Sequence, residues 1–224
     1  MNDRLILTIS VLGGTGKEGQ ALAYRWAKAG YHVILGSRSA ERAADAAAAL
    51  NERLGKDLVR GMANDQAAAE CDIAVLTVPY AAHRQTLESL KDRLRGKILV
   101  DVTVPLVPPK VSTVQMPSAG SATQEAQQIL GAETKVVAAF QNVSHEHLSE
   151  DHPLACDVLV CGDSQEARDQ VLQLVEAAGL LGWDAGPAQN AVVVEGLTSV
   201  LIGINKRYRL RGAGIRILGE RTSE

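Results

Sequence analysis

The sequence predicts an α/β fold, a doubly wound parallel sheet with a smaller C-terminal α/β part packed against it. Two observations predict this class: short apolar segments alternate with segments of helical periodicity along most of the 224 residues, and glycines follow several of the helical segments. With 46% hydrophobic residues, the chain can fill a core of this kind. We expect residues 1–150 to form the regular domain and residues 151–224 a smaller part that closes a substrate cleft.

The individual elements follow from local patterns. A buried parallel strand is a continuous apolar run, whereas a helix places apolar residues three to four positions apart. Ser39 precedes a helical pattern as an N-cap, and Gly30, Gly55 and Gly96 stand where helices are expected to end. In chain order we expect a strand over 5–12, a helix over 17–29, a strand over 31–36, a helix over 39–54, a strand over 58–62, a helix over 65–70, a strand over 72–79, a helix over 81–94, a strand over 97–104, a helix over 121–131, strands over 135–140 and 156–163, a helix over 164–179 and an apolar helix over about 188–207.

Charge and composition exclude some partners. Lys and Arg number 23 against 26 Asp and Glu, and no basic block could follow a phosphate backbone, so we expect no nucleic-acid partner. The first apolar run is too short to span a bilayer, so we expect no membrane partner and a cytoplasmic location. Cys71, Cys156 and Cys161 lack C-x-x-C spacing and lie in or beside apolar segments, as buried free thiols do.

A glycine-rich turn over 11–20, VLGGTGKEGQ, follows the first strand and opens the first helix. Glycines in this context let a pyrophosphate approach backbone amides at the positive end of a helix, and they indicate a dinucleotide site on a Rossmann-type sheet. An ordinary strand-to-helix turn is the alternative. The residues expected to bind the cofactor here are Gly14, Thr15, Gly16, Lys17 and Glu18.

The end of the second strand indicates which dinucleotide is bound. An NAD site places an acidic residue there for the ribose hydroxyls, but this chain has Ser37 and Arg38, with Arg42 one helical turn further on. A hydroxyl and two guanidinium groups suit a 2′-phosphate, because arginine forms charge-assisted bonds to phosphate oxygens. The sequence therefore predicts NADP. Alternatively, Arg42 pairs with Glu41 or Asp45 on the surface of its helix.

The fourth strand ends in a segment that we expect to border the cofactor. Ligands of doubly wound sheets lie beyond the carboxyl ends of the strands, so the residues at this strand end are candidates. A simple strand terminator would use the same proline. These candidate residues are Thr77, Val78, Pro79 and Tyr80.

With these segments in order, the chain resembles the F420H2:NADP oxidoreductases, a family of NADPH-dependent F420 reductases. The resemblance is carried by LGGTGKEG, GSR with a basic residue four positions after the Arg, CDIAVLTVP, PLVP, VCGD, WDAGP, VEGLTSVLI and GIRIL, and it covers nearly the whole chain. It implies an N-terminal Rossmann domain, NADP on the glycine turn and the Ser37–Arg42 segment, and the deazaflavin coenzyme F420 in a cleft against the nicotinamide.

Where the sixth strand ends, the chain departs from archaeal members of this family, which have a histidine at the position of Gln141. Glutamine donates and accepts hydrogen bonds but carries no charge. An ordinary strand-end loop is the alternative for this segment. The residues expected to line the reacting rings are Gln141, Asn142 and Val143.

The function that the resemblance implies is hydride transfer between NADP(H) and F420, and it needs no acid–base side chain, so we name no catalytic residue. Two alternatives remain open. One is reduction of another acceptor, such as a flavin, a ferric chelate or an imine, which the change to Gln141 favours. The other is a non-catalytic NADP(H) sensor.

Three further features remain: a histidine-rich segment, His83 and the late apolar helix. His145, His147 and His152 lie among acidic residues but without a ligand spacing typical of metals, so we expect a polar loop and no metal site. His83 is interpreted as an exposed helix residue. The late helix is apolar on more than one face, so we expect a homodimer; burial against its own sheet is the alternative.

Overall fold

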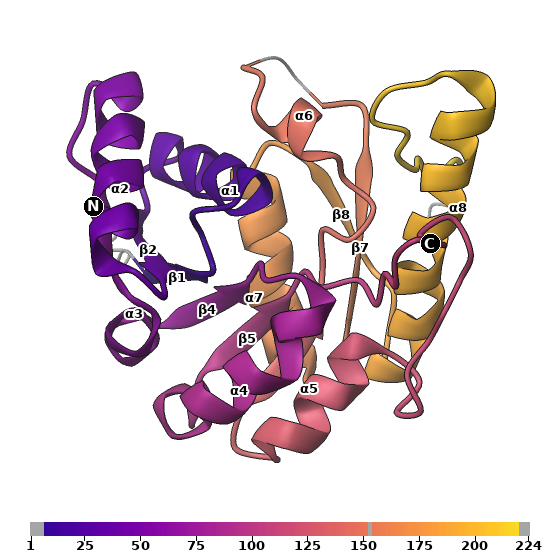
Figure 1. Cartoon of the computed structure of the whole chain (residues 1–224), viewed down its shortest axis with the longest axis horizontal. Helices are drawn as coiled ribbons and strands as arrows, with labels where there is room; N and C mark the ends of the chain where they lie inside the picture. The colour runs from indigo at the N-terminus through magenta and orange to yellow at the C-terminus, as the bar shows by residue number, and fades with distance from the viewer. Residues whose placement is uncertain (1–6, 152–153, 220–224) are drawn as a thin grey trace, which may run out of the picture.

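The computed structural model describes residues 7–151 and 154–219. Its elements, shown in Figure 1, are β1 (Thr8–Leu12), α1 (Lys17–Lys28), β2 (His32–Ser37), α2 (Ala40–Leu54), β3 (Val59–Ala63), α3 (Asn64–Glu70), β4 (Ile73–Leu76), α4 (Tyr80–Leu94), β5 (Ile98–Asp101), α5 (Ala122–Leu130), β6 (Lys135–Ala138), α6 (His145–Leu148), β7 (Asp157–Gly162), α7 (Gln165–Ala177), β8 (Leu181–Asp184), the 3₁₀ turn η1 (Ala188–Asn190) and α8 (Ala191–Tyr208).

The strands form one eight-stranded sheet in the order β3-β2-β1-β4-β5-β6-β7-β8, which confirms the predicted fold class. The first six strands are parallel, β7 is antiparallel to β6, and β8 is parallel to β7. The chain runs outward from β1 to β3 and then returns to β4 beside β1. The carboxyl ends of β1 and β4 therefore meet at the switch point where such sheets bind ligands.

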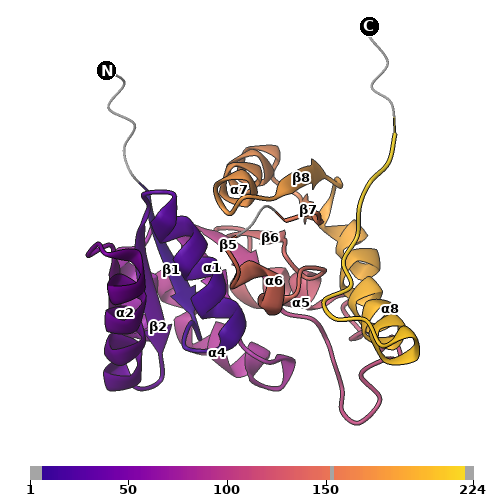
Figure 2. The ribbon, with the colours of Figure 1, turned by 90° about the horizontal axis from the view of Figure 1, so that it is seen from above.

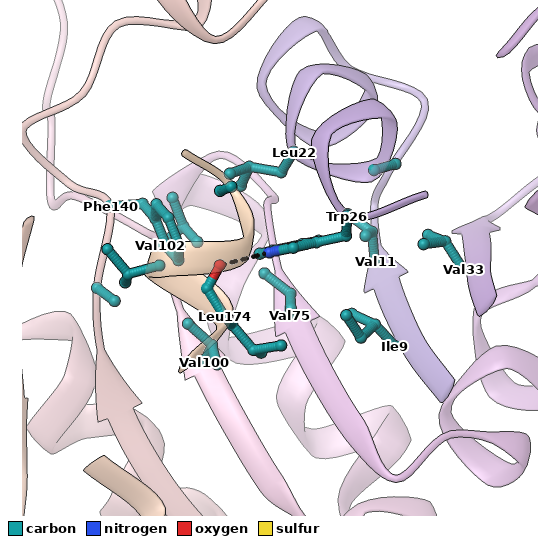
Figure 3. Close-up of a cluster of buried hydrophobic side chains, with 14 of the residues drawn as sticks. Ile9, Val11, Leu22, Trp26, Val33, Val75, Val100, Val102, Phe140 and Leu174 are labelled. Atoms are coloured by element: carbon teal, nitrogen blue, oxygen red, sulfur yellow. Dashed lines mark hydrogen bonds between the residues drawn. The ribbon is translucent and has the colours of Figure 1, made fainter. Parts of the chain in front are cut away.

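Alternate residues of each strand pack against opposite faces of the sheet. Ile9, Val11, Val75 and Val100 join the cluster with α1, α2, α6 and α7, whereas Leu12, Leu76 and Leu99 join α3, α4 and α5 on the other face. Figure 3 shows the first cluster around Trp26, whose Nε1 donates a hydrogen bond to the Leu174 carbonyl oxygen at 2.8 Å. This bond satisfies the one polar atom of the side chain inside the core.

The last helix lies at the opposite end of the molecule from α2 (Figures 1 and 2). Its buried residues Ala191 and Val194 pack against Ala138 of β6 and Cys161 of β7. The long loop between β5 and α5 reaches it, since a Cβ on Gly196 would lie 3.3 Å from Cγ1 of Val114. The loop and α8 thus lie side by side.

The structure confirms the predicted helix cap and the predicted state of the cysteines, but it contains a strand that was not predicted. Ser39 caps α2 as expected, because its hydroxyl accepts a bond from the Arg42 amide at 3.3 Å, and all three cysteines are buried and free. The strand β8 was missed because its four residues, LGWD, include a glycine and are partly exposed, which leaves no apolar run to detect. In the described part of the chain, no helix combines the length and apolar character that crossing a membrane requires.

Candidate functional site

The glycine turn joins β1 to α1, and its glycines serve different purposes. The amide of Gly14 donates to the carbonyl oxygens of Val11 and Gly36 at 3.1 and 2.9 Å, and a Cβ on Gly14 would lie 2.5 Å from the Val11 oxygen. A Cβ on Gly19 would lie 2.7 Å from the Gly14 Cα. These two positions exclude side chains because the helix packs closely on the strand.

Gly16 is different because nothing in the protein occupies the space beside it. A Cβ there would meet only the Gly13 carbonyl oxygen, at 3.8 Å. Gly16 is exposed, and as the N-cap of α1 it offers no side chain to the first-turn amides. An open glycine before an uncapped helix end is a suitable place for a pyrophosphate, which supports the sequence-based interpretation.

A cavity of about 710 Å³ opens at the carboxyl ends of β1, β4, β5 and β6. It contains many of the predicted site residues: Gly16, Lys17, Glu18, Thr77, Val78, Pro79, Gln141 and Val143. Tyr80, expected beside the cofactor, also lines it, whereas other lining residues were not predicted: Val102, Thr103, Phe140 and Thr198. The volume is in the range of pockets that hold drug-sized ligands.

The predicted 2′-phosphate residues lie outside this cavity, at the neighbouring end of β2. Ser37 is buried, and its Oγ accepts a bond from the Ser39 amide at 3.3 Å, whereas Arg38 and Arg42 are exposed. Neither guanidinium forms an ion pair within residues 7–151 and 154–219, so the pairing of Arg42 with its helix neighbours is not observed. Both side chains are available for an anion.

The far end of the cavity is formed by the residues that come directly after β6. Phe140 takes a left-handed backbone conformation, with φ of 72°, and packs edge-on against Trp26 with ring centroids 5.8 Å apart (Figure 3). Gln141 follows it and is only 5% exposed. Its Nε2 donates to the Asp101 carbonyl oxygen at 2.7 Å, while its Oε1 is buried without a partner among the described residues. A buried acceptor of this kind suits a ligand N–H.

Asn142 is a predicted site residue that does not line the cavity. Its Nδ2 donates to the Val194 carbonyl oxygen at 2.9 Å and lies 3.1 Å from Oγ1 of Thr198. Thr198 in turn donates to the Gln141 carbonyl oxygen at 2.8 Å. These bonds attach α8 to the strand end that bears Gln141.

Glu18 lies in the first turn of α1 and lines the cavity. Burial raises its pKa from 4.5 to about 8, and its Oε1 is buried without a hydrogen-bond partner among the described residues. The carboxyl group is therefore mostly protonated near neutral pH.

His83 was expected to be exposed, and this was wrong. Its side chain is fully buried, and its Nε2 lies 2.7 Å from Oδ2 of Asp101, which is equally buried at the end of β5. Burial by itself lowers the pKa of His83, but the hydrogen bond and the negative charge of Asp101 outweigh burial and raise the pKa. The periodicity of α4 turns this position toward the sheet, where the carboxylate stabilises it.

A second buried carboxylate joins this region from α8. Glu195 accepts bonds from the amides of Ala122 and Thr123 at 2.7 and 3.0 Å and from the Thr123 hydroxyl at 2.8 Å, so it caps α5. Burial raises its pKa to about 7. Sequence reasoning missed Asp101 and Glu195. The detectable signal was a single acid inside an otherwise apolar segment, ILVD in β5 and VVVEGL in α8.

The histidine-rich segment shows no metal site among the residues that the structure describes. His147 lies in α6, with Nε2 2.9 Å from the Gly212 carbonyl oxygen, and His152 falls outside the described residues. A larger hollow of about 900 Å³ lies near the amino end of β6, away from the glycine turn. Gln127 lines that hollow, and both Oε1 and Nε2 of its side chain form hydrogen bonds with main-chain groups. Its polar atoms therefore stabilise the fold.

Comparisons with known proteins agree on one family. The family described as "NADP oxidoreductase coenzyme F420-dependent" matches residues 8–105. The F420-dependent NADP reductase of Methanocaldococcus jannaschii is 39% identical over 221 residues, 94% of this chain and 98% of that protein. The F420-dependent NADP reductase of Methanothermobacter thermautotrophicus is 40% identical over 221 residues, 95% of each chain.

A solved structure shares the fold. It is a candidate F420-dependent NADP reductase from Arthrobacter sp. FB24, with a TM-score of 0.79 at 24% identity over 95% of this chain and 100% of that one. Sequence identity of 39% and 40% over nearly the whole chain, together with the family match, means that the protein belongs to the F420-dependent NADP oxidoreductase family.

Proposed function

We propose that this chain transfers a hydride between NADP(H) and the deazaflavin coenzyme F420. Membership of the family makes it an NADP-dependent oxidoreductase. The observation that carries the proposal is the continuity of the site: the open turn at Gly16 leads into the same cavity that ends at Gln141. A dinucleotide and a second ring system have room to meet there.

In this proposal the cofactor lies along the carboxyl ends of the strands. The backbone from Thr15 to Glu18 binds the pyrophosphate, as amides at a helix start can. Ser37, Arg38 and Arg42 bind the 2′-phosphate through a hydroxyl and two guanidinium groups. The predicted residues that line the cavity border the nicotinamide and the deazaflavin: Thr77, Val78, Pro79, Gln141 and Val143. Asn142 supports this end of the site indirectly, through its bonds to α8.

The chemistry asks little of side chains. A hydride passes between C4 of the nicotinamide and C5 of the deazaflavin, which are supplied by the two coenzymes. The protein aligns the rings and excludes water, for which the apolar residues Val78, Val102 and Phe140 are suited. We name no catalytic residue.

The proposal extends to the domain division, the location and the oligomeric state of the protein. A division near residue 150 would separate the cofactor domain from a C-terminal part that carries α7, β8 and α8. The free, buried state of the three cysteines is compatible with a cytoplasmic location. Val192, Val193 and Val200 of α8 are 37%, 66% and 45% exposed, and this apolar surface supports a homodimer.

The test is a turnover assay with purified protein, NADPH and oxidised F420. We expect the visible absorption band of the deazaflavin to disappear with NADPH and far more slowly with NADH. Tight NADPH binding without F420 reduction would contradict the proposal. Parallel assays with a flavin, a ferric chelate and an imine would then separate another reductase from a sensor.

A further inference from the structure

Beneath the cavity lies a histidine–aspartate pair that the hydride step does not use. The side chains of His83 and Asp101 are both 0% exposed, and the distance from Nε2 to Oδ2 is 2.7 Å. Burying an ionisable pair costs desolvation and contributes little net stability, so its presence calls for another explanation.

Asp101 connects this pair to two residues of the cavity. Its Oδ1 accepts a bond from the Thr103 amide at 3.0 Å, and its carbonyl oxygen accepts one from Nε2 of Gln141 at 2.7 Å. Thr103 and Gln141 both line the cavity. A shift of Asp101 would therefore move both of them.

Thr103 and Gln141 share an unusual property. Oγ1 of Thr103 and Oε1 of Gln141 are buried, and neither has a hydrogen-bond partner in the described ranges. Because Nε2 of Gln141 donates to the Asp101 carbonyl oxygen, the amide cannot be flipped, and Oε1 is available as an acceptor. Buried polar atoms are rarely left without a partner, so these two, with Oε1 of Glu18 as a third in the cavity, indicate a ligand group that donates.

The second ring nitrogen of His83 lies near another carboxylate without a hydrogen bond to it. This Nδ1 lies 3.7 Å from Oε2 of Glu125, and Glu125 is held by Arg84 and by the Tyr80 hydroxyl at 3.0 Å. The Tyr80 and His83 rings lie 5.8 Å apart between centroids. The Nε2 contact with Asp101 and the neighbouring Tyr80 ring orient the imidazole, while its Nδ1 has no hydrogen-bond partner among the described residues.

We propose that His83 and Asp101 are a positioning pair that presents Thr103 Oγ1 and Gln141 Oε1 to an amide or imide N–H of the ring bound at this end of the cavity. The nicotinamide carboxamide and the deazaflavin imide both carry such an N–H. The inference rests on the proposed function, and it adds specificity: one coenzyme ring is held by its N–H edge, which sets its alignment for hydride transfer.

The experiment compares two neutral amides in place of the imidazole. His83→Gln places an N–H where Nε2 was and can still reach Asp101, whereas His83→Asn is too short. Gln141→Leu removes the acceptor itself. Thr134→Val is the matched control, since it loses a buried hydroxyl bond of 3.0 Å to the Leu94 carbonyl oxygen, away from the cavity.

Dissociation constants are measured on the full chain for NADPH, oxidised F420 and 2′,5′-ADP, a fragment that lacks the nicotinamide. We expect Gln141→Leu and His83→Asn to weaken the same ring-bearing ligand by about 5- to 10-fold, the effect of one lost hydrogen bond. His83→Gln and Thr134→Val should stay within about 2-fold of the wild type, and 2′,5′-ADP should bind all variants alike. Whether NADPH or F420 is affected identifies the ring.

The double variant His83→Asn/Gln141→Leu tests whether the histidine acts through the glutamine. Coupled residues are non-additive, so the double variant should lose less affinity than the product of the two single losses. Multiplied losses, an equal loss for 2′,5′-ADP, or unchanged binding by His83→Asn would each overturn the proposal. If His83→Asn does not fold, the double variant His83→Leu/Asp101→Asn replaces it, because this variant leaves no carboxylate unpaired. Its ligand binding is then compared with that of the wild type in the same way.

The proposed function is tested separately by the wild type. If wild-type protein reduces F420 but the variants bind normally, only the positioning role fails. If the wild type binds NADPH without reducing F420, the proposed function fails, while the effects of His83→Asn on the binding of NADPH and F420 still decide the positioning role.

Discussion

Specificity for NADP depends on single residues at the tip of β2. Arg38 is exposed and has no ion-pair partner among the described residues, so its guanidinium is free to bind a phosphate. Arg38→Ala should weaken NADP binding by about 1.5–3 kcal/mol, roughly 10- to 100-fold, and leave NAD binding nearly unchanged. Titration of both cofactors checks this. Arg60→Ala, at an exposed arginine paired with Glu70, is the control, and equal losses for NADP and NAD would refute the 2′-phosphate assignment.

The two kinds of glycine in the turn predict opposite phenotypes. Gly16→Val should leave the fold intact, because a Cβ there meets nothing closer than 3.8 Å, yet abolish binding of NADP and NAD. Gly14→Ala should cost about 1–3 kcal/mol of stability through overpacking, since its Cβ would lie 2.5 Å from a carbonyl oxygen. Thermal melts and cofactor titrations separate the two effects. Normal NADP affinity in Gly16→Val would mean that the turn binds something else.

Glu18 predicts a pH dependence of stability. Its pKa is about 8 in the folded protein against an ordinary 4.5, so the folded state keeps a proton that the unfolded chain has released. The contribution of the protonated Glu18 to the free energy of unfolding is complete below pH 4.5 and is lost as the pH rises to about 8. Glu18→Gln should therefore be more stable than the wild type at pH 9, with a difference that shrinks toward pH 5.

Urea denaturation at several pH values measures this difference. Glu41→Gln, an exposed glutamate also in the first turn of a helix, is the control and should follow the wild type. Parallel stability curves for Glu18→Gln and the wild type would contradict the assignment.

At the scale of elements, the Asn142 amide and the Thr198 hydroxyl attach α8 to the strand end. Asn142→Ala leaves the Val194 carbonyl oxygen without its donor and should cost about 1–3 kcal/mol. For a chain of this size that corresponds to a fall in melting temperature of about 2–4 °C per kcal/mol. Because Asn142 does not line the cavity, NADP affinity should change little. A large loss of affinity with an unchanged melting temperature would place Asn142 in direct contact with the cofactor.

The sequence predicted elements wherever the information was local. The Ser39 cap, the glycine turn and the apolar runs of β1 and β4 each depend on neighbouring residues, and the structure confirms them. It did not predict the His83–Asp101 pair or the Glu195 cap on Thr123, which join residues 18 and 72 positions apart. No periodicity encodes which polar groups meet across a sheet, so these contacts needed the fold.

At the scale of the whole molecule, the exposed valines of α8 predict a homodimer. The chain should elute at twice 23.8 kDa in light scattering, and Val193→Asp should produce monomers by placing a charge in an apolar interface. Leu181→Asp is the matched control, because Leu181 is 52% exposed on the edge strand β8. Monomers from Leu181→Asp instead would place the interface at the sheet edge.

The central claim is that two coenzymes meet in one cavity and exchange a hydride directly. Turnover with NADPH deuterated at the transferable C4 position tests it, with mass spectrometry of the reduced F420. We expect the deuterium at C5 of the deazaflavin, because rings held in contact and shielded from water leave no route for exchange. Reduced F420 that carries solvent hydrogen in place of the label would contradict direct transfer and, with it, the shared site.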